Sequence, residues 1–323
     1  MSEILKVSIN DFKTQAGAVY SPLNLFYQHF GKDYNTAPVI LVNHSLTGDS
    51  NVSGNNGWWS EIIGPGLTID TNYYSIIAFN IPGNGVKGSM IKQYNHFHTG
   101  DIARLFFEAL KLLGIKKLHA IIGGSIGGGI VWEMGAKYPN FAKHLIPVAA
   151  DWKASDWIIA NTFLQKRILE NSSKPLEDAR IHAMLTYRTP NSFHDRFARS
   201  KNEENNLYNV ENWLLHHGKK LKNRFKLDAY VFMNHLLASV DITRSINSLE
   251  EVIGKIKSSI HLIAIDSDLF FLSSEDKLTF EKVKLLKKNI TYNEIKSIHG
   301  HDAFLIENEK ISKILKPIFK NNK

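Results

Sequence analysis

Hydrophobic and polar positions along the first part of this 323-residue chain predict a set of β-strands. Residues 4–12 and 23–31 alternate between apolar and polar side chains, which is typical of a pair of strands at the edge of a sheet. Residues 37–45 and 73–80 are almost continuously apolar, which is typical of strands with both faces covered. We therefore expect a sheet in which an edge pair is followed by buried strands.

A helical pattern follows these strands. Between residues 101 and 115 the apolar side chains recur at helical spacing, with Asp101 placed to cap the first turn and Gly114 to end the helix. An apolar strand, a glycine-rich turn, a helix at 126–139 and a strand at 143–151 come next. Strands that alternate with helices predict a parallel sheet with helices on both of its faces.

The pattern changes after Asp151. Residues 152–239 are rich in charge, lack strand patterns and contain four helical patterns, at 156–171, 176–187, 210–225 and 228–240. Strands and helices alternate again from residue 258 to a last helix at 308–320. We predict that residues 1–151 and 240–323 form one α/β unit, and that 152–239 is an all-helical insertion covering one end of its sheet.

Composition and charge exclude several classes of protein. The chain has no cysteine, which rules out disulfides, cysteine metal sites and a thiol nucleophile. Much of the +8 charge lies in residues 216–226 and 315–323, which lack nucleic-acid-binding motifs, so we interpret it as solvated surface that would also suit an anionic small molecule such as coenzyme A. Without an export signal or a bilayer-spanning stretch, we expect a soluble, cytoplasmic protein with no nucleic-acid or membrane partner.

The segment Gly123-Gly124-Ser125-Ile126-Gly127 fits the pattern G-x-S-x-G between an apolar strand and a helix. In such a nucleophile elbow the serine has a strained backbone, and small neighbours allow the turn to tighten. A glycine-rich turn that only packs, or that binds phosphate, is the alternative. The absence of G-x-G-x-x-G at the first strand favours the elbow, with Ser125 as the nucleophile.

A serine nucleophile needs a histidine base and a carboxylate, which follow it along the chain in the order Ser, Asp, His in this fold class. Asp266 and Asp268 come just after an apolar strand, and His299 and His301 come after the last predicted strand. Both pairs lie at the sheet edge where such groups are presented. The pattern alone leaves two candidates for each role.

The oxyanion of an acyl-transfer reaction needs backbone N–H donors. In this architecture one donor is the residue after the serine, Ile126, and another comes from the loop after an early strand. Leu46, Thr47 and Gly48 are the candidates in that loop. A polar turn without function is the alternative interpretation of the same residues.

Several segments together resemble the homoserine O-acetyltransferase family of α/β-hydrolase-fold acyltransferases. They span nearly the whole chain and include, in this order, LTGD at 46–49, GWW at 57–59, IGPG at 63–66 and GHDAFL at 300–305. These motifs are much more specific than G-x-S-x-G, which unrelated esterases also carry. The resemblance implies an α/β-hydrolase fold, with a mostly parallel sheet flanked by helices and with residues 152–239 as an inserted helical lid.

The resemblance also implies a role for individual residues. Ser125 matches the family's nucleophile, Asp268 its acid and His301 its base. Leu46 and Ile126 match the positions whose backbone N–H groups form the oxyanion hole. The family pattern thus chooses between the two carboxylates and between the two histidines.

Four further positions match those that hold the family's amino-acid substrate: Thr47, Arg180, Tyr187 and Asp302. A zwitterionic acceptor needs a fixed cation for its carboxylate and an anion for its ammonium group, and Arg180 and Asp302 supply one of each. The chain departs from the family after residue 83, where residues 84–101 form a shorter stretch without the usual cysteine. We expect that stretch near the mouth of the pocket.

The implied activity is ping-pong transfer of an acetyl group from acetyl-CoA, through an acyl-serine, to the hydroxyl of homoserine in methionine biosynthesis, with no metal or bound cofactor. A homodimer formed through the helical block, with Trp157 and Trp213 among its aromatic residues, is also implied. Three alternatives stay open at this point: a hydrolase of esters or thioesters, an acyltransferase with another acyl-CoA or with serine as acceptor, and a non-catalytic binding protein on the same fold.

Overall fold

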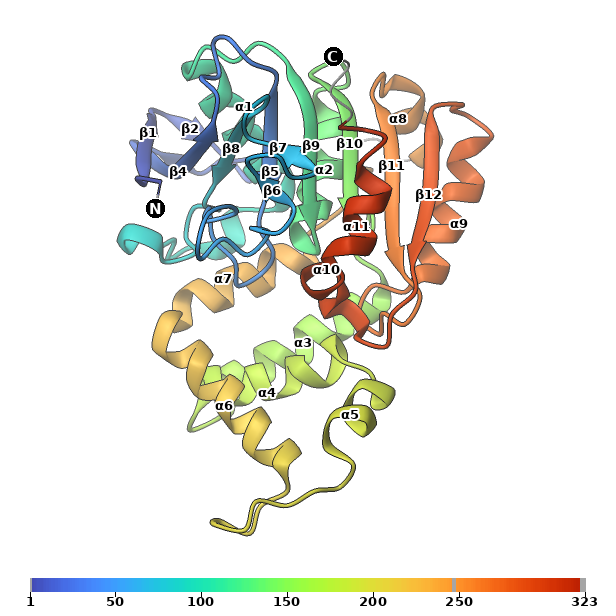
Figure 1. The fold of residues 1–323 in the computed structure, drawn as a ribbon. Helices are drawn as coiled ribbons and strands as arrows, with labels where there is room; N and C mark the ends of the chain where they lie inside the picture. The colour runs from blue at the N-terminus through green and yellow to red at the C-terminus, as the bar shows by residue number, and fades with distance from the viewer. Residues whose placement is uncertain (1, 246–247, 320–323) are drawn as a thin grey trace.

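An eight-stranded sheet lies at the centre of the computed structural model, which describes residues 2–245 and 248–319 (Figure 1). The strand order is β1-β4-β8-β5-β9-β10-β11-β12, and β4 pairs in the antiparallel sense with β1 and β8 while the other neighbours are parallel. The strands are β1 (Leu5–Ile9), β4 (Leu23–Gly31), β5 (Val39–Asn43), β8 (Ser75–Phe79), β9 (Leu118–Gly124), β10 (Ala142–Val148), β11 (Ser259–Ile265) and β12 (Ile290–Ile295). The mostly parallel sheet and its N-terminal edge pair are confirmed.

Alternate side chains of each central strand enter two separate hydrophobic layers. In β5 all five residues are buried; Leu41 belongs to the layer that also contains Phe106 and Trp132, and Ile40 belongs to the layer that also contains Ile311. The first layer lies under α1 (Thr99–Leu112), α2 (Ile126–Lys137), α8 (Leu249–Lys255) and α9 (Ser273–Lys284). The second layer lies under α10 (Ala303–Ile306) and α11 (Asn308–Leu315). Two separate two-stranded sheets complete the strands: β2 (Phe12–Lys13) with β3 (Val19–Tyr20), and β6 (Ile63–Gly64) with β7 (Ile69–Asp70).

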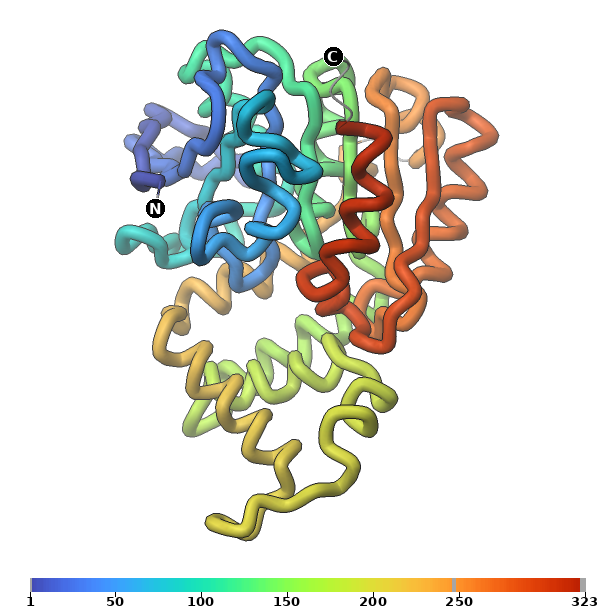
Figure 2. The backbone as a smooth tube through the Cα atoms, viewed as in Figure 1, coloured from blue at the N-terminus to red at the C-terminus, as the bar shows by residue number. Residues whose placement is uncertain are grey.

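Of the six α-helices described between β10 and β11, all but α8 lie beyond the carboxyl ends of the parallel strands (Figures 1 and 2). They are α3 (Asp156–Asn171), α4 (Pro175–Tyr187), α5 (Pro190–Phe197), α6 (Asn209–Arg224) and α7 (Leu227–Ala238). The four expected helices are present, and α5 and α8 are additions. Both are short helices with a side-chain cap, in which Thr189 accepts from the Ser192 N–H and Ser248 from the Glu251 N–H.

The start of α1 corrects the expectation for Asp101. The N-cap is His98, whose side chain accepts a hydrogen bond from the Asp101 backbone N–H, while the Asp101 carboxylate accepts from the His98 N–H in a capping box. Asp101 Oδ1 also accepts from the Gln15 N–H at 2.9 Å. From its position inside the first turn, the fully buried carboxylate therefore has hydrogen-bond donors on both the helix and the N-terminal segment. Gly114 ends the helix at a φ of 79° as expected, and the last residue of the predicted helix 308–320 lies outside the described residues.

Candidate active site

Ser125 stands between β9 and α2 in a backbone conformation that side chains rarely adopt, with φ 59° and ψ −131°. Its N–H donates to the Val148 carbonyl at 2.9 Å, and its own carbonyl accepts from the N–H groups of Gly128 and Gly129. A conformation of this kind costs about 1–3 kcal/mol and persists only where its surroundings hold it. The strand pairing and the first turn of α2 together hold the serine in this turn.

The glycines on both sides of Ser125 are required by space. A Cβ at Gly123 would lie 2.6 Å from the carbonyl of Gly127, and a Cβ at Gly127 would lie 2.5 Å from the Asn43 carbonyl oxygen. Real side chains do not approach backbone that closely, so any substitution would push β9, α2 and the end of β5 apart. The G-x-S-x-G pattern therefore reflects close packing of three elements around the serine.

His301 and Asp268 form a buried pair at the carboxyl ends of β12 and β11. His301 Nδ1 lies 2.6 Å from Asp268 Oδ2, and the other oxygen of Asp268 accepts from the backbone N–H groups of Phe270 and Phe271 at 2.7 and 2.9 Å. Asp268 has no proton to donate when ionised, so His301 carries its proton on Nδ1. This leaves Nε2 of His301 free to accept a proton from another group.

The two rival residues make other contacts. Asp266 Oδ1 accepts from the Ser297 N–H at 2.9 Å, and its Oδ2 lies 3.7 Å from the ammonium group of Lys296. His299 Nδ1 lies 3.4 Å from Ser192 Oγ. Neither rival belongs to the buried histidine and carboxylate pair.

Aromatic rings surround the imidazole of His301. The rings of Tyr187, Phe270, Phe271 and Phe304 have their centroids 5.3 to 5.4 Å from that of His301. Gly300, before the histidine, has a φ of 64°, and a Cβ there would lie 2.8 Å from the Tyr187 carbonyl oxygen. The histidine loop therefore packs directly against the end of α4, which holds the imidazole in a single position.

A small cavity joins most of the predicted site residues. It is lined by Ser45, Leu46, Thr47, Ser125, Arg180, Tyr187, His301, Asp302, Phe304 and Leu305. Of the remaining predicted residues, Asp268 lies behind His301, and Ile126 is the buried first residue of α2. Within the described residues Ser125 makes no hydrogen bond to His301, a bond that is often loose until substrate binds.

The loop after β5 is held by a buried histidine that sequence reasoning missed. His44 Nδ1 lies 2.7 Å from the Ser45 carbonyl oxygen, and its Nε2 accepts from the Ile81 N–H at 3.0 Å. These partners require a neutral ring with its proton on Nδ1, and burial lowers the pKa of His44 in the same direction. His44 thus fixes the backbone just before Leu46, the predicted oxyanion donor.

A second missed residue, Arg224, connects the helical block to the same loop. Its guanidinium, at the end of α6, donates to the Thr47 carbonyl at 2.7 Å and to Thr47 Oγ1 at 3.3 Å. Desolvation and then the neighbouring Arg180 lower the pKa of Arg224 from its ordinary value. The basic run 216–226, interpreted from the sequence as solvated surface, therefore contributes one cation to the site, because α6 ends against the Thr47 loop.

Asp302, one of the charged residues of the cavity, pairs with an arginine that the sequence did not indicate. Asp302 Oδ2 lies 3.8 Å from Nη1 of Arg188, a residue only 8% exposed. Burial raises the pKa of Asp302 above its ordinary value, and the charges of Arg180 and Arg188 only partly offset that effect. Arg180 lies with its guanidinium carbon 5.6 Å from the centre of the Tyr187 ring. The predicted cation and anion therefore share one small cavity, with Arg188 as an additional partner of the anion.

Residues 84–98 form the stretch in which the chain departs from the family pattern. Within the described residues they are absent from the lining of the cavity at Ser125. Tyr94 packs instead against α7, with its ring 5.2 Å from that of His235, and His98 caps α1. This stretch therefore supports one end of the helical block, while its first residue, Asn84, has its Nδ2 3.4 Å from Nε2 of His44. The expectation that the stretch lies near the pocket mouth stays a prediction.

Across residues 2–245 and 248–319, no group of three or more His, Cys, Asp or Glu side chains is arranged to hold a metal ion. The same part of the chain contains no helix with both the length and the apolar character needed to cross a bilayer.

Known proteins resemble this chain in sequence and in fold. The alpha/beta hydrolase fold family matches residues 38–228. A homoserine O-acetyltransferase of Chloroherpeton thalassium is 31% identical, covering 96% of this chain and 88% of the relative. The homoserine O-acetyltransferase structure from Bacillus anthracis (TM-score 0.87, 19% identity, 99% and 98% coverage) and that of the acetyl esterase MekB (0.85, 19%, 99% and 97%) share the fold. The chain belongs to the homoserine O-acetyltransferase family within the α/β-hydrolase fold.

Proposed function

We propose that the protein transfers an acetyl group from acetyl-CoA to the side-chain hydroxyl of homoserine, through an acyl group on Ser125. The observation that carries this proposal is the cavity at Ser125, in which Arg180 and Asp302 lie beside the serine and His301. An ester hydrolase needs only the serine and the histidine with its carboxylate, and has no use for Arg180 and Asp302. A fixed cation and a fixed anion in the same cavity suit a zwitterionic amino acid as acceptor.

In the first half-reaction His301 acts as general base. Its Nε2 takes the proton of Ser125 Oγ, and the oxygen attacks the thioester carbonyl carbon of acetyl-CoA. The N–H groups of Leu46 and Ile126 stabilise the oxyanion, and the loop contacts of His44 and Arg224 support that arrangement. The carbon–sulfur bond then breaks, and coenzyme A leaves as a thiol with the proton from His301.

In the second half-reaction the amino acid replaces coenzyme A. Arg180 binds its carboxylate and Asp302 its ammonium group, with Thr47 and Tyr187 completing the site. His301 takes the proton of the acceptor hydroxyl, whose oxygen attacks the acyl carbon. The bond to Ser125 Oγ breaks, the serine regains a proton from His301, and O-acetylhomoserine, a precursor of methionine, is released.

Transfer requires that water loses the competition for the acyl group. We assign this role to residues 152–239 as a lid on a catalytic unit of residues 1–151 and 240–323. Arg180, Tyr187 and Arg224 come from helices of this block and reach the cavity or the oxyanion loop, so the same segment orients the acceptor and covers the serine. Both effects favour the bound hydroxyl over bulk water.

Hydrolysis of esters is the second candidate, because an acetyl esterase shares this fold. The test is a matrix of acyl donors (acetyl-, propionyl- and succinyl-CoA) against acceptors (homoserine, serine and water), read by mass spectrometry. Our proposal expects O-acetylhomoserine to form only with both acetyl-CoA and homoserine present. Thiol release at one rate with and without homoserine, and without acetylated amino acid, would establish the hydrolase instead.

We also propose that the protein works in the cytoplasm as a homodimer formed through its helical block. Exposed apolar side chains on α3 and α4 support this, with Ile159, Phe163 and Leu185 exposed by 46%, 63% and 51%. Trp213 packs against the rings of Phe193 and Phe197 and serves the block itself. The mass of the full chain in solution, measured by light scattering for the native protein and for Phe163→Asp, tests the dimer.

A further inference from the structure

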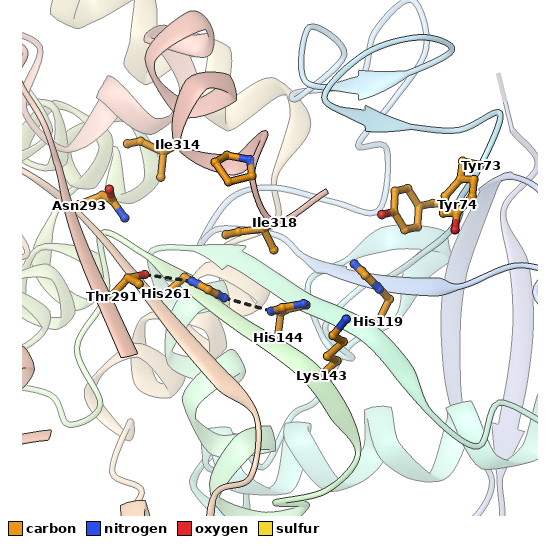
Figure 3. A pocket seen from close by; sticks show the side chains of 11 residues that line it. Tyr73, Tyr74, His119, Lys143, His144, His261, Thr291, Asn293, Ile314 and Ile318 are labelled. Carbon is orange, nitrogen blue, oxygen red and sulfur yellow. Dashed lines mark hydrogen bonds between the residues drawn. The ribbon is translucent and has the colours of Figure 1, made fainter. Parts of the chain in front are cut away.

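Three histidines from neighbouring parallel strands form a row on one face of the sheet (Figure 3). They are His119 of β9, His144 of β10 and His261 of β11. His144 Nδ1 lies 3.1 Å from His261 Nε2, and His261 Nδ1 lies 2.9 Å from the hydroxyl of Thr291 on β12. The ring of His119 lies 5.2 Å from that of His144. A chain of imidazoles thus crosses three strands.

These histidines line a pocket of about 680 Å³. The other residues around it are Tyr73, Tyr74, Lys143, Asn293 and, from α11 and the turn after it, Ile314, Pro317 and Ile318 (Figure 3). His119 is the second residue of β9 and Ser125 directly follows the strand, so their Cα atoms are six residue steps apart, or about 20 Å along the strand. The pocket is therefore distinct from the candidate active site at the other end of the sheet.

The charged groups of this pocket are of one sign. Lys143 is its cation, the three histidines and the two tyrosines are its other titratable groups, and β12 and the α11 segment contribute only Thr291, Asn293 and apolar residues to the described lining. Aspartate and glutamate are absent from that lining. The site therefore offers hydrogen-bond donors and positive charge to a ligand, without a carboxylate to repel an anion.

The imidazoles have unused binding capacity. His119 Nε2 is buried and has no hydrogen-bond partner among residues 2–245 and 248–319. Burial is the main cause that lowers the pKa of His144 to about 4, and the neighbouring His261, His119 and Lys143 add to it. Burial and then Lys143 lower the pKa of His119, and burial lowers that of His261. Near neutral pH the rings are therefore neutral, and an anion placed among them would raise their pKa values and draw protons onto them.

We propose that this pocket is a binding site for a small oxyanion of the phosphate or carboxylate class, held by Lys143 and by the imidazoles of His119 and His144. The Lys143 ammonium provides the fixed charge, and the imidazoles donate hydrogen bonds to the anion oxygens. Each imidazole that becomes protonated takes its proton from solvent, so binding is accompanied by proton uptake. The inference is independent of the acyl-transfer chemistry at Ser125.

The test is isothermal titration calorimetry of the full-length protein with inorganic phosphate, and in a second arm with succinate, at about pH 6 and pH 8. Each titration is repeated in two buffers with different ionisation enthalpies, which yields the number of protons taken up. We expect saturable binding that weakens at least fivefold from pH 6 to pH 8, with net proton uptake at neutral pH. Comparison of the two arms identifies the preferred oxyanion, while failure of both to bind at either pH would refute the site.

Variants locate the binding. Lys143→Met changes an exposed side chain and should weaken binding at least tenfold, and Lys282→Met on the exposed face of α9 is the matched control of equal charge change. His144→Gln should lower the number of protons taken up, because one of the imidazoles that hold the anion is then missing. Arg180→Ala should bind phosphate as the native protein does. Equal affinity in Lys143→Met and Lys282→Met, or loss of binding in Arg180→Ala alone, would overturn the proposal and place the anion elsewhere.

Discussion

His301 Nδ1 lies 2.6 Å from Oδ2 of Asp268, and the second oxygen of that carboxylate is held by the backbone N–H groups of Phe270 and Phe271. Four aromatic rings surround the imidazole, so neither partner is free to turn. Asp268 thereby sets the tautomer of His301 and directs Nε2 away from the pair. A base fixed in this way suits proton transfer to and from Ser125.

Replacing the carboxylate by an amide should destroy this arrangement with little change in shape. Asp268→Asn should lower kcat about 10³- to 10⁴-fold, because an amide can donate to Nδ1 and stabilise the wrong tautomer of His301. Asp266→Asn is the control, since Asp266 binds the Ser297 N–H and Lys296 outside the pair. Steady-state kinetics with acetyl-CoA and homoserine measure both, and similar losses in the two variants would contradict the assignment.

Arg180 should affect only the second half-reaction. Loss of a charge-assisted hydrogen bond costs about 1.5–3 kcal/mol, so Arg180→Ala should raise the KM for homoserine roughly 10- to 100-fold. The burst of thiol from acetyl-CoA should keep its amplitude, because the acceptor is absent from that step. Arg167→Ala, an exposed position on α3, is the control. An unchanged homoserine dependence would remove Arg180 from the acceptor site.

Arg224 should act through the oxyanion loop. Its two hydrogen bonds to Thr47 hold the residue next to Leu46, so Arg224→Met should slow acylation about tenfold or more, the cost of one charge-assisted contact. Stopped-flow measurement of thiol release gives the acylation rate directly. Lys219→Met, on the same helix and exposed, should leave that rate unchanged. Equal acylation rates for Arg224→Met and the native enzyme would show that the loop holds its shape without Arg224.

The buried carboxyl group of Asp151, whose pKa the charge of Asp268 helps to raise, predicts that the stability of the protein depends on pH. Burial, then the charges of Glu275 and Asp268, raise the pKa of Asp151 to about 8 from 3.8. Between these values the folded protein holds a proton that the unfolded chain has lost, so the free energy of unfolding falls as pH rises from about 4 to about 8. Burial and then the charge of Asp151 also raise the pKa of the neighbouring Asp276. Asp151→Asn should therefore lessen that fall in urea titrations without removing it, and an equally steep decline in the variant would contradict a buried proton at Asp151.

The parts of the fold that the sequence predicted share one property. Residues 39–42 and 120–122 are continuous apolar runs inside the two strands at 37–45 and before Ser125. The elbow is specified by glycines that the close approach of three elements requires. Such signals are local, and each follows from burial or from backbone geometry. The same holds for α4 and α7, whose apolar faces recur at helical spacing.

The missed features depend on contacts between distant parts of the chain. Arg224 meets Thr47 across 177 residues, and His44 meets Ile81 only because two loops lie side by side after folding. Composition around Arg224 indicates a basic surface, and nothing nearby marks one of its cations as different. By contrast, the Thr189-Pro190 start of α5 is a local capping signal that could have predicted that helix.

The central claim is that Ser125 carries the acyl group from acetyl-CoA to an amino-acid hydroxyl. The most direct measurement mixes the enzyme with acetyl-CoA, quenches it, and locates the label by mass spectrometry, with and without a following addition of homoserine. We predict one acetyl group on the peptide containing Ser125, its loss on adding homoserine with equal formation of O-acetylhomoserine, and no label in Ser125→Ala. Full turnover by Ser125→Ala, or an acetyl group that passes to water at the same rate with and without homoserine, would contradict the account.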